Sequence, residues 1–279
     1  MSTYSPTNNT HSKIATLLCL CWVSVIPASA DSLDLTTSTV RITGADTLLL
    51  ENLLVGEHAY SAEIQLNLDG SYIVHAVEEI VLETTASYQV SFESSWSSMS
   101  HPYQYPSGLS HFSGLIGATH NASTRFWQYG EIASLGIEHM AELGSKASLQ
   151  AEVAAAIANG DAQHLLSGGG IGISPGSVSL QFQVSNSHPF ITLVSMIAPS
   201  PDWFIGVSAL SLIENSQWVD ELVVPLYAYD AGSDSGISYT SPDSNTLPKA
   251  QIARLEELPF LVNGEVPPLG TFTFRRIFE

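Results

Sequence analysis

Two acidic turns, each placed after an apolar run, constrain the fold of this chain more than any other feature of its sequence. One apolar run leads into Asp202, and a second leads into Asp230 and Asp234. Gly232 lies between the last two acids, and glycine lets a loop fold back sharply because it accepts positive φ without a steric penalty. The apolar runs predict buried strands, so both turns are expected at strand ends of one β structure.

Carboxylates that converge without a basic partner repel one another, and a hard divalent cation relieves that repulsion. Calcium fits this chemistry because it takes about six to eight oxygen ligands in loose geometry. An ordinary acidic turn is the alternative, since Asp and Gly are common in turns of every kind. The spacing of the acids alone leaves both interpretations open.

Strand-like patterns recur along residues 85–279, which we interpret as one large domain. Residues 85–94 and the closing stretch 270–278 alternate apolar and polar side chains, which is the pattern of a half-buried strand. Further strands are predicted at residues 178–184, 190–197, 204–213 and 222–229. A series of strands joined by loops predicts a mainly β, antiparallel sandwich.

Two helices are predicted between these strands, where they would cover one face or end of the sandwich. Apolar residues recur every three or four positions in residues 127–144, and Gly144 is a suitable C-terminal stop. Residues 148–158 show the same spacing. An irregular loop is predicted at residues 96–120, and a helical turn is predicted at residues 250–257.

The region before the large domain, residues 31–84, contains several short strand-like segments. Asp69-Gly70 separates two alternating apolar runs, and an Asp-Gly pair in that setting is a strong hairpin signal. We therefore expect a small β-hairpin region that packs on the main domain or extends its sheet. No motif in this region carries chemistry.

Residues 1–30 have the pattern of a cleavable secretory signal peptide. Their apolar run, residues 14–26, is shorter than the roughly 20 apolar residues that a spanning helix needs, which disfavours an uncleaved anchor. Small residues before and at Ala30 predict cleavage after that position, and secretion or a periplasmic location would follow. Cys19 and Cys21, the two cysteines of the chain, lie inside this segment, so the mature chain is expected to form no disulfide.

The charge balance excludes several classes of partner. The chain has 8 Lys and Arg residues against 27 Asp and Glu residues, a formal net charge of −19. Nucleic acid is therefore not an expected partner, because its phosphates attract basic surfaces. The same charge disfavours unassisted binding to anionic lipid. Charged residues make up 13% of the chain, which is about half of the usual share and suits an extracellular β-rich domain.

The acidic turns lie within two specific motifs, Ser-Pro-Asp-Trp-Phe at residues 200–204 and Asp-Ala-Gly-Ser-Asp-Ser-Gly at residues 230–236. With these motifs, the chain from about Tyr88 to its C-terminus resembles the spondin N-terminal domain family, the F-spondin/mindin-like module that also occurs in bacterial secreted proteins. Further matching residues are Trp96-Ser97, His101-Pro102, His111-Phe112-Ser113, residues 117–121, Trp127, Trp218 and Ser241-Pro242.

The resemblance implies a C2-like β-sandwich with one Ca²⁺ site and an extracellular adhesive role without catalysis. The calcium carboxylates of the family fall, position by position, on Asp202, Asp230 and Asp234. The implied partner is a protein or glycan ligand at an extracellular surface. Because its mature part has no cysteines, the chain is similar to the free-standing bacterial type of the family.

Calcium-dependent phospholipid binding is one alternative function, in which the ion would bridge the acidic loops to lipid head groups. It requires exposed apolar loop tips. Trp203 and Phe204 are the candidates beside Asp202, and both are expected in the core instead. Membrane lipid is therefore a disfavoured partner.

A metal-dependent hydrolase is the other alternative, because His101, His111 and His120 fall in one predicted loop. Their spacing does not match the close His pairs of zinc sites, so we expect hydrogen-bonded braces. His139 and Glu142 lie one helical turn apart, but no nucleophile accompanies them, so we do not expect acid–base catalysis from this pair.

Overall fold

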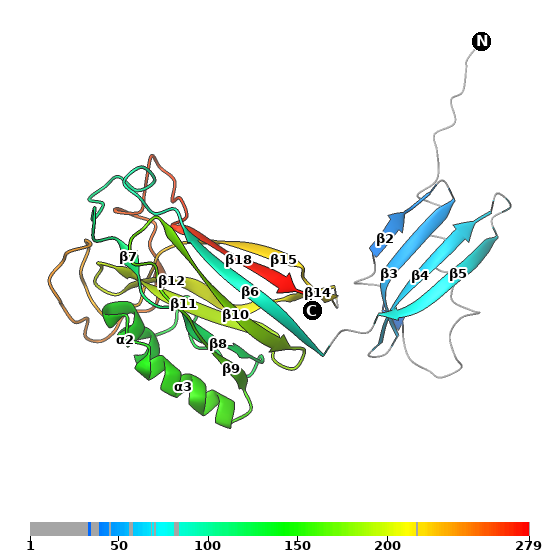
Figure 1. Ribbon diagram of the computed structural model, residues 1–279, viewed down its shortest axis with the longest axis horizontal. Helices are drawn as coiled ribbons and strands as arrows, with labels where there is room; N and C mark the ends of the chain where they lie inside the picture. The colour runs from blue at the N-terminus through cyan, green and yellow to red at the C-terminus, as the bar shows by residue number, and fades with distance from the viewer. Residues whose placement is uncertain are drawn as a thin grey trace, which may run out of the picture. The chain divides into compact units, whose positions relative to one another are not determined.

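The computed structural model describes residues 33–34, 39–44, 46–55, 58–67, 69, 71–80, 84–215 and 217–278 (Figure 1). The chain forms two compact units that divide between Val81 and Leu82. The expected signal peptide, residues 1–30, lies outside the described residues together with both cysteines. None of the described helices is long and apolar enough to cross a membrane.

The first unit is a five-stranded antiparallel sheet with a small core of Leu50, Ala62 and Ile64. Its strands are β1 (Leu33–Asp34), β2 (Thr39–Ile42), β3 (Thr47–Val55), β4 (His58–Leu66) and β5 (Tyr72–Ile80). β4 and β5 pair Leu66 with Tyr72, which confirms the hairpin predicted at Asp69-Gly70. The expected hairpin region is thus a sheet of its own.

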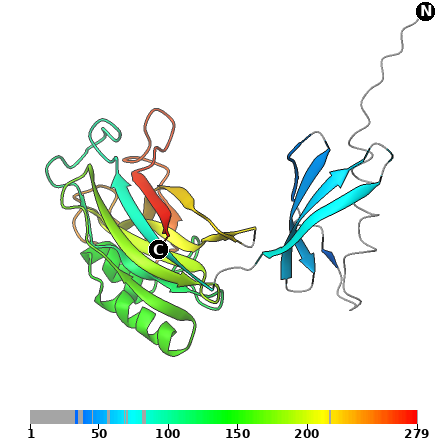
Figure 2. The same cartoon turned by 45° about the vertical axis from the view of Figure 1, so that its right-hand side comes forward.

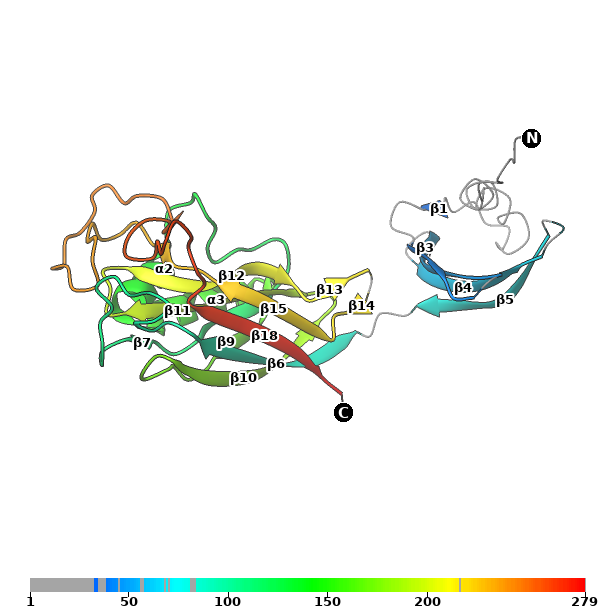
Figure 3. The same cartoon turned by 90° about the horizontal axis from the view of Figure 1, so that it is seen from above.

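The second unit is a β-sandwich of two main antiparallel sheets, as the strand patterns predict (Figure 3). The first sheet has the order β10-β6-β18-β15, with β6 (Thr85–Ser94), β10 (Gly176–Ser185), β15 (Glu221–Leu226) and β18 (Gly270–Ile277). The second has the order β17-β16-β12-β11-β8-β9, with β8 (Ile116–His120), β9 (Ala162–Ser167), β11 (Phe190–Ala198), β12 (Trp203–Ser211), β16 (Tyr229–Asp230) and β17 (Ala253–Arg254). Shorter pairs are β7 (His111–Phe112) with β11, and β13 (Ile213–Glu214) with β14 (Gln217–Trp218).

The main core lies between the two sheets and follows from the alternation of their strands. Tyr88, Val90 and Phe92 of β6 are fully buried, and β18 buries Phe272 and Phe274 beside them. The ring centroids of Phe92 and Phe272 are 5.3 Å apart at an interplanar angle of 86°, which is the edge-to-face arrangement that aromatic rings prefer. Period-two patterning therefore decides which face of each strand is buried.

Helices α2 (Leu135–Leu143) and α3 (Ala147–Ala158) connect β8 to β9 and cover the outer face of the second sheet (Figures 1 and 2). Both predicted helices are present, but the first begins at residue 135 and not at 127. Ser134 caps it by accepting a hydrogen bond from the Ile137 N–H, and Gly130 at φ 81° belongs to a turn. Gly144 ends the helix with a left-handed φ of 62°, as predicted.

A central strand lies where the sequence predicts an irregular loop. β8 falls inside residues 96–120, and all five of its residues are buried, so it shows no alternation of apolar and polar side chains. Gly117 allows its close approach to β11, because a Cβ there would lie 1.9 Å from the Thr192 carbonyl oxygen. The expectation of a loop is wrong at this strand because burial on both faces removes the periodic signal.

Two other expectations near the C-terminus are also wrong. The single strand predicted at residues 222–229 is divided, because the chain crosses from one sheet to the other after Leu226. β15 pairs with β18, whereas β16 pairs with β12. The helical turn predicted at residues 250–257 is instead strand β17, which satisfies the backbone of β16 along its free edge.

Candidate metal centre

Backbone pairing brings the two acidic turns together at one end of the sandwich. Trp203 of β12 pairs with Asp230 of β16, and the Ala231 N–H donates to the Asp202 carbonyl oxygen at 3.1 Å. The backbone N–H of Asp234 donates to the Asp202 side chain at 3.0 Å. The three acids that the sequence singles out therefore share one neighbourhood, although they come from two loops.

Asp202 is the buried centre of this neighbourhood, with no exposed surface. Its Oδ2 accepts hydrogen bonds from the Ser233 N–H at 2.7 Å, the Ser233 hydroxyl at 3.2 Å and the Asp234 N–H. Its Oδ1 is also buried, yet no residue in the described part of the chain donates to it. Burial, followed by the charge of Asp230, raises the pKa of the Asp202 carboxyl from 3.8 to about 6.

Asp230 and Asp234 shape the second turn through bonds to its backbone. Asp230 Oδ1 accepts from the Gly232 N–H at 2.8 Å, while Asp234 accepts from the N–H groups of Gly236 at 2.6 Å and Ser244 at 2.8 Å. Burial raises the pKa of Asp230, and the charge of Asp234 adds to the rise. Gly232 has φ 76°, and a Cβ there would lie 2.3 Å from the Ala250 carbonyl oxygen, so only glycine fits.

Glu142, near the end of α2, is a fourth acid of this neighbourhood that the calcium prediction missed. Burial raises its pKa, the Ser233 hydroxyl opposes the rise, and the charges of Glu138, Asp202 and Asp234 add to it. The helical spacing in the sequence associates Glu142 with His139, but the His139 ring bonds to the Ser148 hydroxyl at 2.7 Å. No sequence signal links Glu142 to the acidic turns, because a helix packed on the sheet makes that connection.

These four acids, Asp202, Asp230, Asp234 and Glu142, form what we call the acidic cluster, and none of them belongs to a described ion pair. The described pairs join Lys249 to Glu138, Arg254 to Glu256 and Arg275 to Glu221. The carboxylate oxygens of the acidic cluster, among them the buried Asp202 Oδ1 that has no described donor, have the chemistry that Ca²⁺ selects. Among the residues that the structure describes, no three His, Cys, Asp or Glu side chains stand ready as a group to hold an ion. In chemical type, the all-oxygen donor set fits calcium.

The histidines have structural hydrogen bonds. His101 is buried, with its ring nitrogens 3.1 Å from the Ser100 hydroxyl and 3.3 Å from the Pro267 carbonyl oxygen. His120 is buried against the Asn121 carbonyl oxygen at 2.8 Å and the Thr192 hydroxyl at 2.9 Å. Burial lowers the pKa of both rings. His101 joins two loops and His120 joins β8 to β11, so both are hydrogen-bonded braces, as expected.

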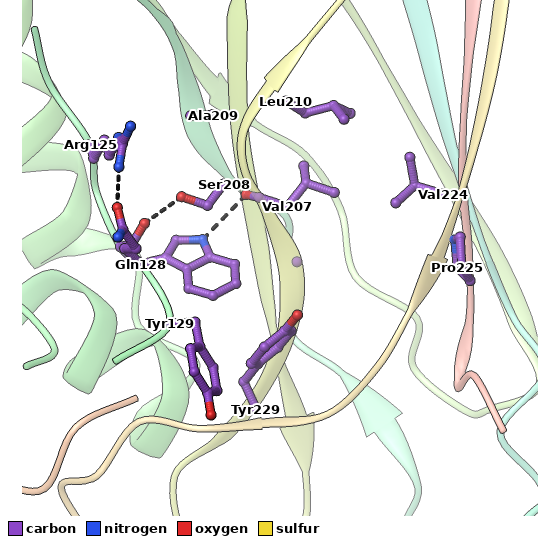
Figure 4. Close-up of a pocket in the computed structure, with 12 residues that line it drawn as sticks. Arg125, Gln128, Tyr129, Val207, Ser208, Ala209, Leu210, Val224, Pro225 and Tyr229 are labelled. Atoms are coloured by element: carbon purple, nitrogen blue, oxygen red, sulfur yellow. Dashed lines mark hydrogen bonds between the residues drawn. The ribbon is translucent and has the colours of Figure 1, made fainter. Parts of the chain in front are cut away.

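A groove of about 510 Å³ is lined by residues of β12 and β15 and by Tyr229 of β16 (Figure 4). Tyr129 and Tyr229 form one wall, and Val224 and Pro225 of β15 lie opposite (Figure 4). Successive strand residues point to opposite faces, so Tyr229 lines the groove while Asp230 belongs to the acidic turn. The Trp127 indole N–H donates to the Val207 carbonyl oxygen at 3.2 Å and fixes the loop that carries Tyr129.

Fold and site together define a β-sandwich module with two helices on one sheet and a buried acidic site at its strand-end turns. A family model, Spondin_N, matches residues 86–260, which is more than half of the chain. The chain therefore belongs to the spondin N-terminal domain family.

Two curated relatives show the extent of the similarity. Spondin-2 of Rattus norvegicus is 33% identical over 204 residues, which cover 69% of this chain and 62% of that protein. Spondin-1 of Homo sapiens is 35% identical over 185 residues, which cover 62% of this chain and 22% of that protein. The chain thus matches less than two thirds of the length of either relative.

Proposed function

We propose that this chain is a secreted, calcium-binding spondin-like module for adhesion or extracellular surface binding, and that it is not an enzyme. One observation carries the calcium assignment. Asp202 Oδ1 is completely buried beside other carboxylates, and the described residues give it no donor. An unsatisfied buried acceptor costs about 1–3 kcal/mol, and a bound cation removes that cost.

Asp202, Asp230 and Asp234 would hold the ion, with backbone carbonyls and water completing its shell. When bound, Ca²⁺ supplies the positive charge that neutralises this cluster. Asp202 already holds Ser233 and Asp234 by their N–H groups, so the backbone of the second turn is in place. The role of the ion would be structural, because it would hold the two strand-end loops as one rigid surface.

Secretion or a periplasmic location is supported by the signal-peptide pattern of residues 1–30 and by membership of the spondin family. The expected partner is a protein or glycan ligand at an extracellular surface. We assign its contact to the groove beside Tyr129, whose ring is 65% exposed and lies near the hydrogen-bonded pair Arg125 and Gln128. Aromatic and arginine side chains of this kind dominate the binding energy at protein interfaces.

Thermal unfolding of the mature chain, residues 31–279, tests the calcium assignment. The midpoint is expected to rise with calcium relative to chelator, by an amount equivalent to about 2.7 kcal/mol at a hundredfold excess over the dissociation constant. An Asp230→Ala, Asp234→Ala double variant should lose the rise, and exposed Asp243→Ala should keep it. Lack of a rise in the wild type up to about 10 mM calcium would refute the assignment.

Calcium-dependent binding to anionic lipid is a second candidate, favoured by a specific feature of the acidic loop. Trp203 and Phe204 are buried in the core, as expected, but Ile237 and Leu247 are 84% and 85% exposed. Both lie between β16 and β17, and the bond from the Ser244 N–H to Asp234 closes the part of that segment that contains Ile237. Exposed apolar tips beside a cation site are what insertion between lipid head groups requires.

Co-sedimentation with phosphatidylserine vesicles separates the two candidates. Lipid docking predicts binding with calcium, none with chelator, and loss of binding in an Ile237→Ser, Leu247→Ser double variant. Ile173→Ser is the control, because Ile173 is 65% exposed but lies in another loop. Equal sedimentation with and without calcium would rule out this second candidate.

A further inference from the structure

We propose that Glu142 of α2 supplies a fourth carboxylate to the cation site of the acidic turns. The inference rests on the proposed calcium binding and extends it from the two loops to a helix. Sequence motifs place only Asp202, Asp230 and Asp234 at this site. The assignment of Glu142 follows from the packing of α2 and from the buried Oε1 atom of Glu142, which has no described hydrogen-bond donor.

The packing of α2 brings Glu142 to the turns. Met140 and Ala141 of α2 belong to the same buried cluster as Phe204 and Ala231, and Ala231 lies between Asp230 and Gly232. The helix is also tied to the end of the acidic loop, where the Lys249 ammonium bonds to Glu138 Oε2. Figure 1 shows the loop between β16 and β17 passing beside α2. Glu142 lies one helical turn after Glu138 on the same face of α2, so it faces the same acidic loop.

Two carboxylate oxygens at this place lack a donor. Glu142 Oε1 is buried with no hydrogen-bond partner among the described residues, and Asp202 Oδ1 is in the same condition. Asp202 itself is fully buried.

One shared cation explains both unsatisfied oxygens. A buried carboxylate oxygen normally accepts a hydrogen bond or binds a metal, and unpaired ones are rare. Lys249, which bonds to the same helix, is already paired with Glu138. A cation held by both Asp202 and Glu142 would satisfy the two oxygens at once, and it would join α2 to both strand-end turns.

Calcium titration calorimetry on the purified protein tests this proposal with two matched variants. Glu142→Gln and Glu138→Gln each remove one negative charge from the same helix, one turn apart, and both charges act on the same neighbourhood. A ligand role for Glu142 predicts a loss of calcium affinity of about tenfold or more in Glu142→Gln, and a much smaller loss in Glu138→Gln. A general effect of charge would instead weaken binding equally in both variants.

A second measurement distinguishes a ligand from a structural residue. In chelator, Glu142→Gln should raise the unfolding midpoint or leave it unchanged, because it removes a buried charge from an acidic cluster. In calcium, the same variant should unfold below the wild type. Equal calcium affinity in Glu142→Gln and wild type would overturn the proposal and leave the three-Asp site standing. No calcium binding by the wild type would overturn both.

Discussion

The side-chain Oδ2 of Asp202 accepts a hydrogen bond from the Ser233 backbone N–H at 2.7 Å, across 31 positions of sequence. One buried carboxylate thereby fixes the start of the loop that follows β16. Its other oxygen, Oδ1, is buried without a donor from the described residues. In Asp202, Oδ2 therefore has a structural role, and Oδ1 is available to a bound ion. Substitutions at this position can separate the two roles.

Asp202→Asn and Asp202→Ala should change stability in opposite directions when calcium is absent. The Asn variant keeps an oxygen acceptor for the Ser233 and Asp234 N–H groups, and it places a neutral amide donor among carboxylates. We expect it to be more stable than the wild type in chelator by about 1–2 kcal/mol. The Ala variant leaves both N–H groups without their acceptor and should lose about 1–3 kcal/mol. Denaturant unfolding in chelator measures both values.

Asp243→Asn is the control for this pair, because Asp243 is exposed and should change stability by less than about 0.5 kcal/mol. Both Asp202 variants should also lose the calcium response. A destabilised Asn variant in chelator would show that the uncompensated charge of Asp202 is not a cost to the fold.

The stability of the calcium-free protein should fall as pH rises from about 4 to about 7, because of Asp202. Its pKa is raised on folding from 3.8 to about 6, so the folded state binds more protons than the unfolded state in this interval. The stability that this proton provides is fully present below the lower value and is lost above the higher one. The shift corresponds to about 3 kcal/mol at most, measurable by denaturant unfolding across the pH series.

The same pH series with calcium should be flatter, because the ion stabilises the charged carboxylate. Asp202→Asn removes the titrating group and provides the comparison. A decline of equal size in that variant would assign the pH dependence to other acids of the protein.

Gly232→Ala should weaken both the fold and the calcium response. Its φ of 76° is strained for alanine, and the added Cβ would lie 2.3 Å from the Ala250 carbonyl oxygen. We expect a loss of about 2 kcal/mol or more in unfolding free energy, measured by denaturant unfolding. Gly172→Ala is the matched control, since nothing lies within 4 Å of the position that its Cβ would take and its φ is not positive. A loss of stability in Gly232→Ala as small as that in Gly172→Ala would mean that the turn tolerates a side chain.

Tyr129→Ala should reduce binding to an extracellular ligand without reducing stability. Tyr129 is 65% exposed at the groove wall, and truncation of such an aromatic residue at an interface costs about 2 kcal/mol, or roughly 30-fold in affinity. Binding to a glycan array and to immobilised extracellular matrix proteins provides the measurement. Tyr103→Ala, at a tyrosine 44% exposed outside the groove, is the control. Equal loss in both variants would contradict the assignment of the groove.

Local patterns in the sequence predicted the strands and helices that bury one face in the core and expose the other face to solvent. β6 and β10 alternate side chains along their whole length, and their antiparallel pairing follows that pattern. The Asp69-Gly70 signal correctly placed the hairpin of β4 and β5, because tight turns favour residue types that are visible in the sequence. Gly144 marks the end of α2 in the same local way, whereas the start of the helix at Leu135 was not predicted.

Other parts of the fold depend on contacts between distant segments, which no local pattern records. β8 is buried on both faces, and β17 exists because β16 offers it a free edge. The division of residues 222–229 between two sheets follows from pairing with β18 and β12. These are tertiary effects that override local preference.

The candidate site shows the same division. The sequence by itself determined the carboxylates of the two acidic turns and the glycine between them, since glycine permits the sharp turn that follows Asp230. Only the tertiary structure decided that Asp202 is buried, that its Oδ2 holds the second turn, and that Glu142 stands beside them. The physical reason is that burial and charge proximity are set by the packing of a helix and two strands far apart in the chain.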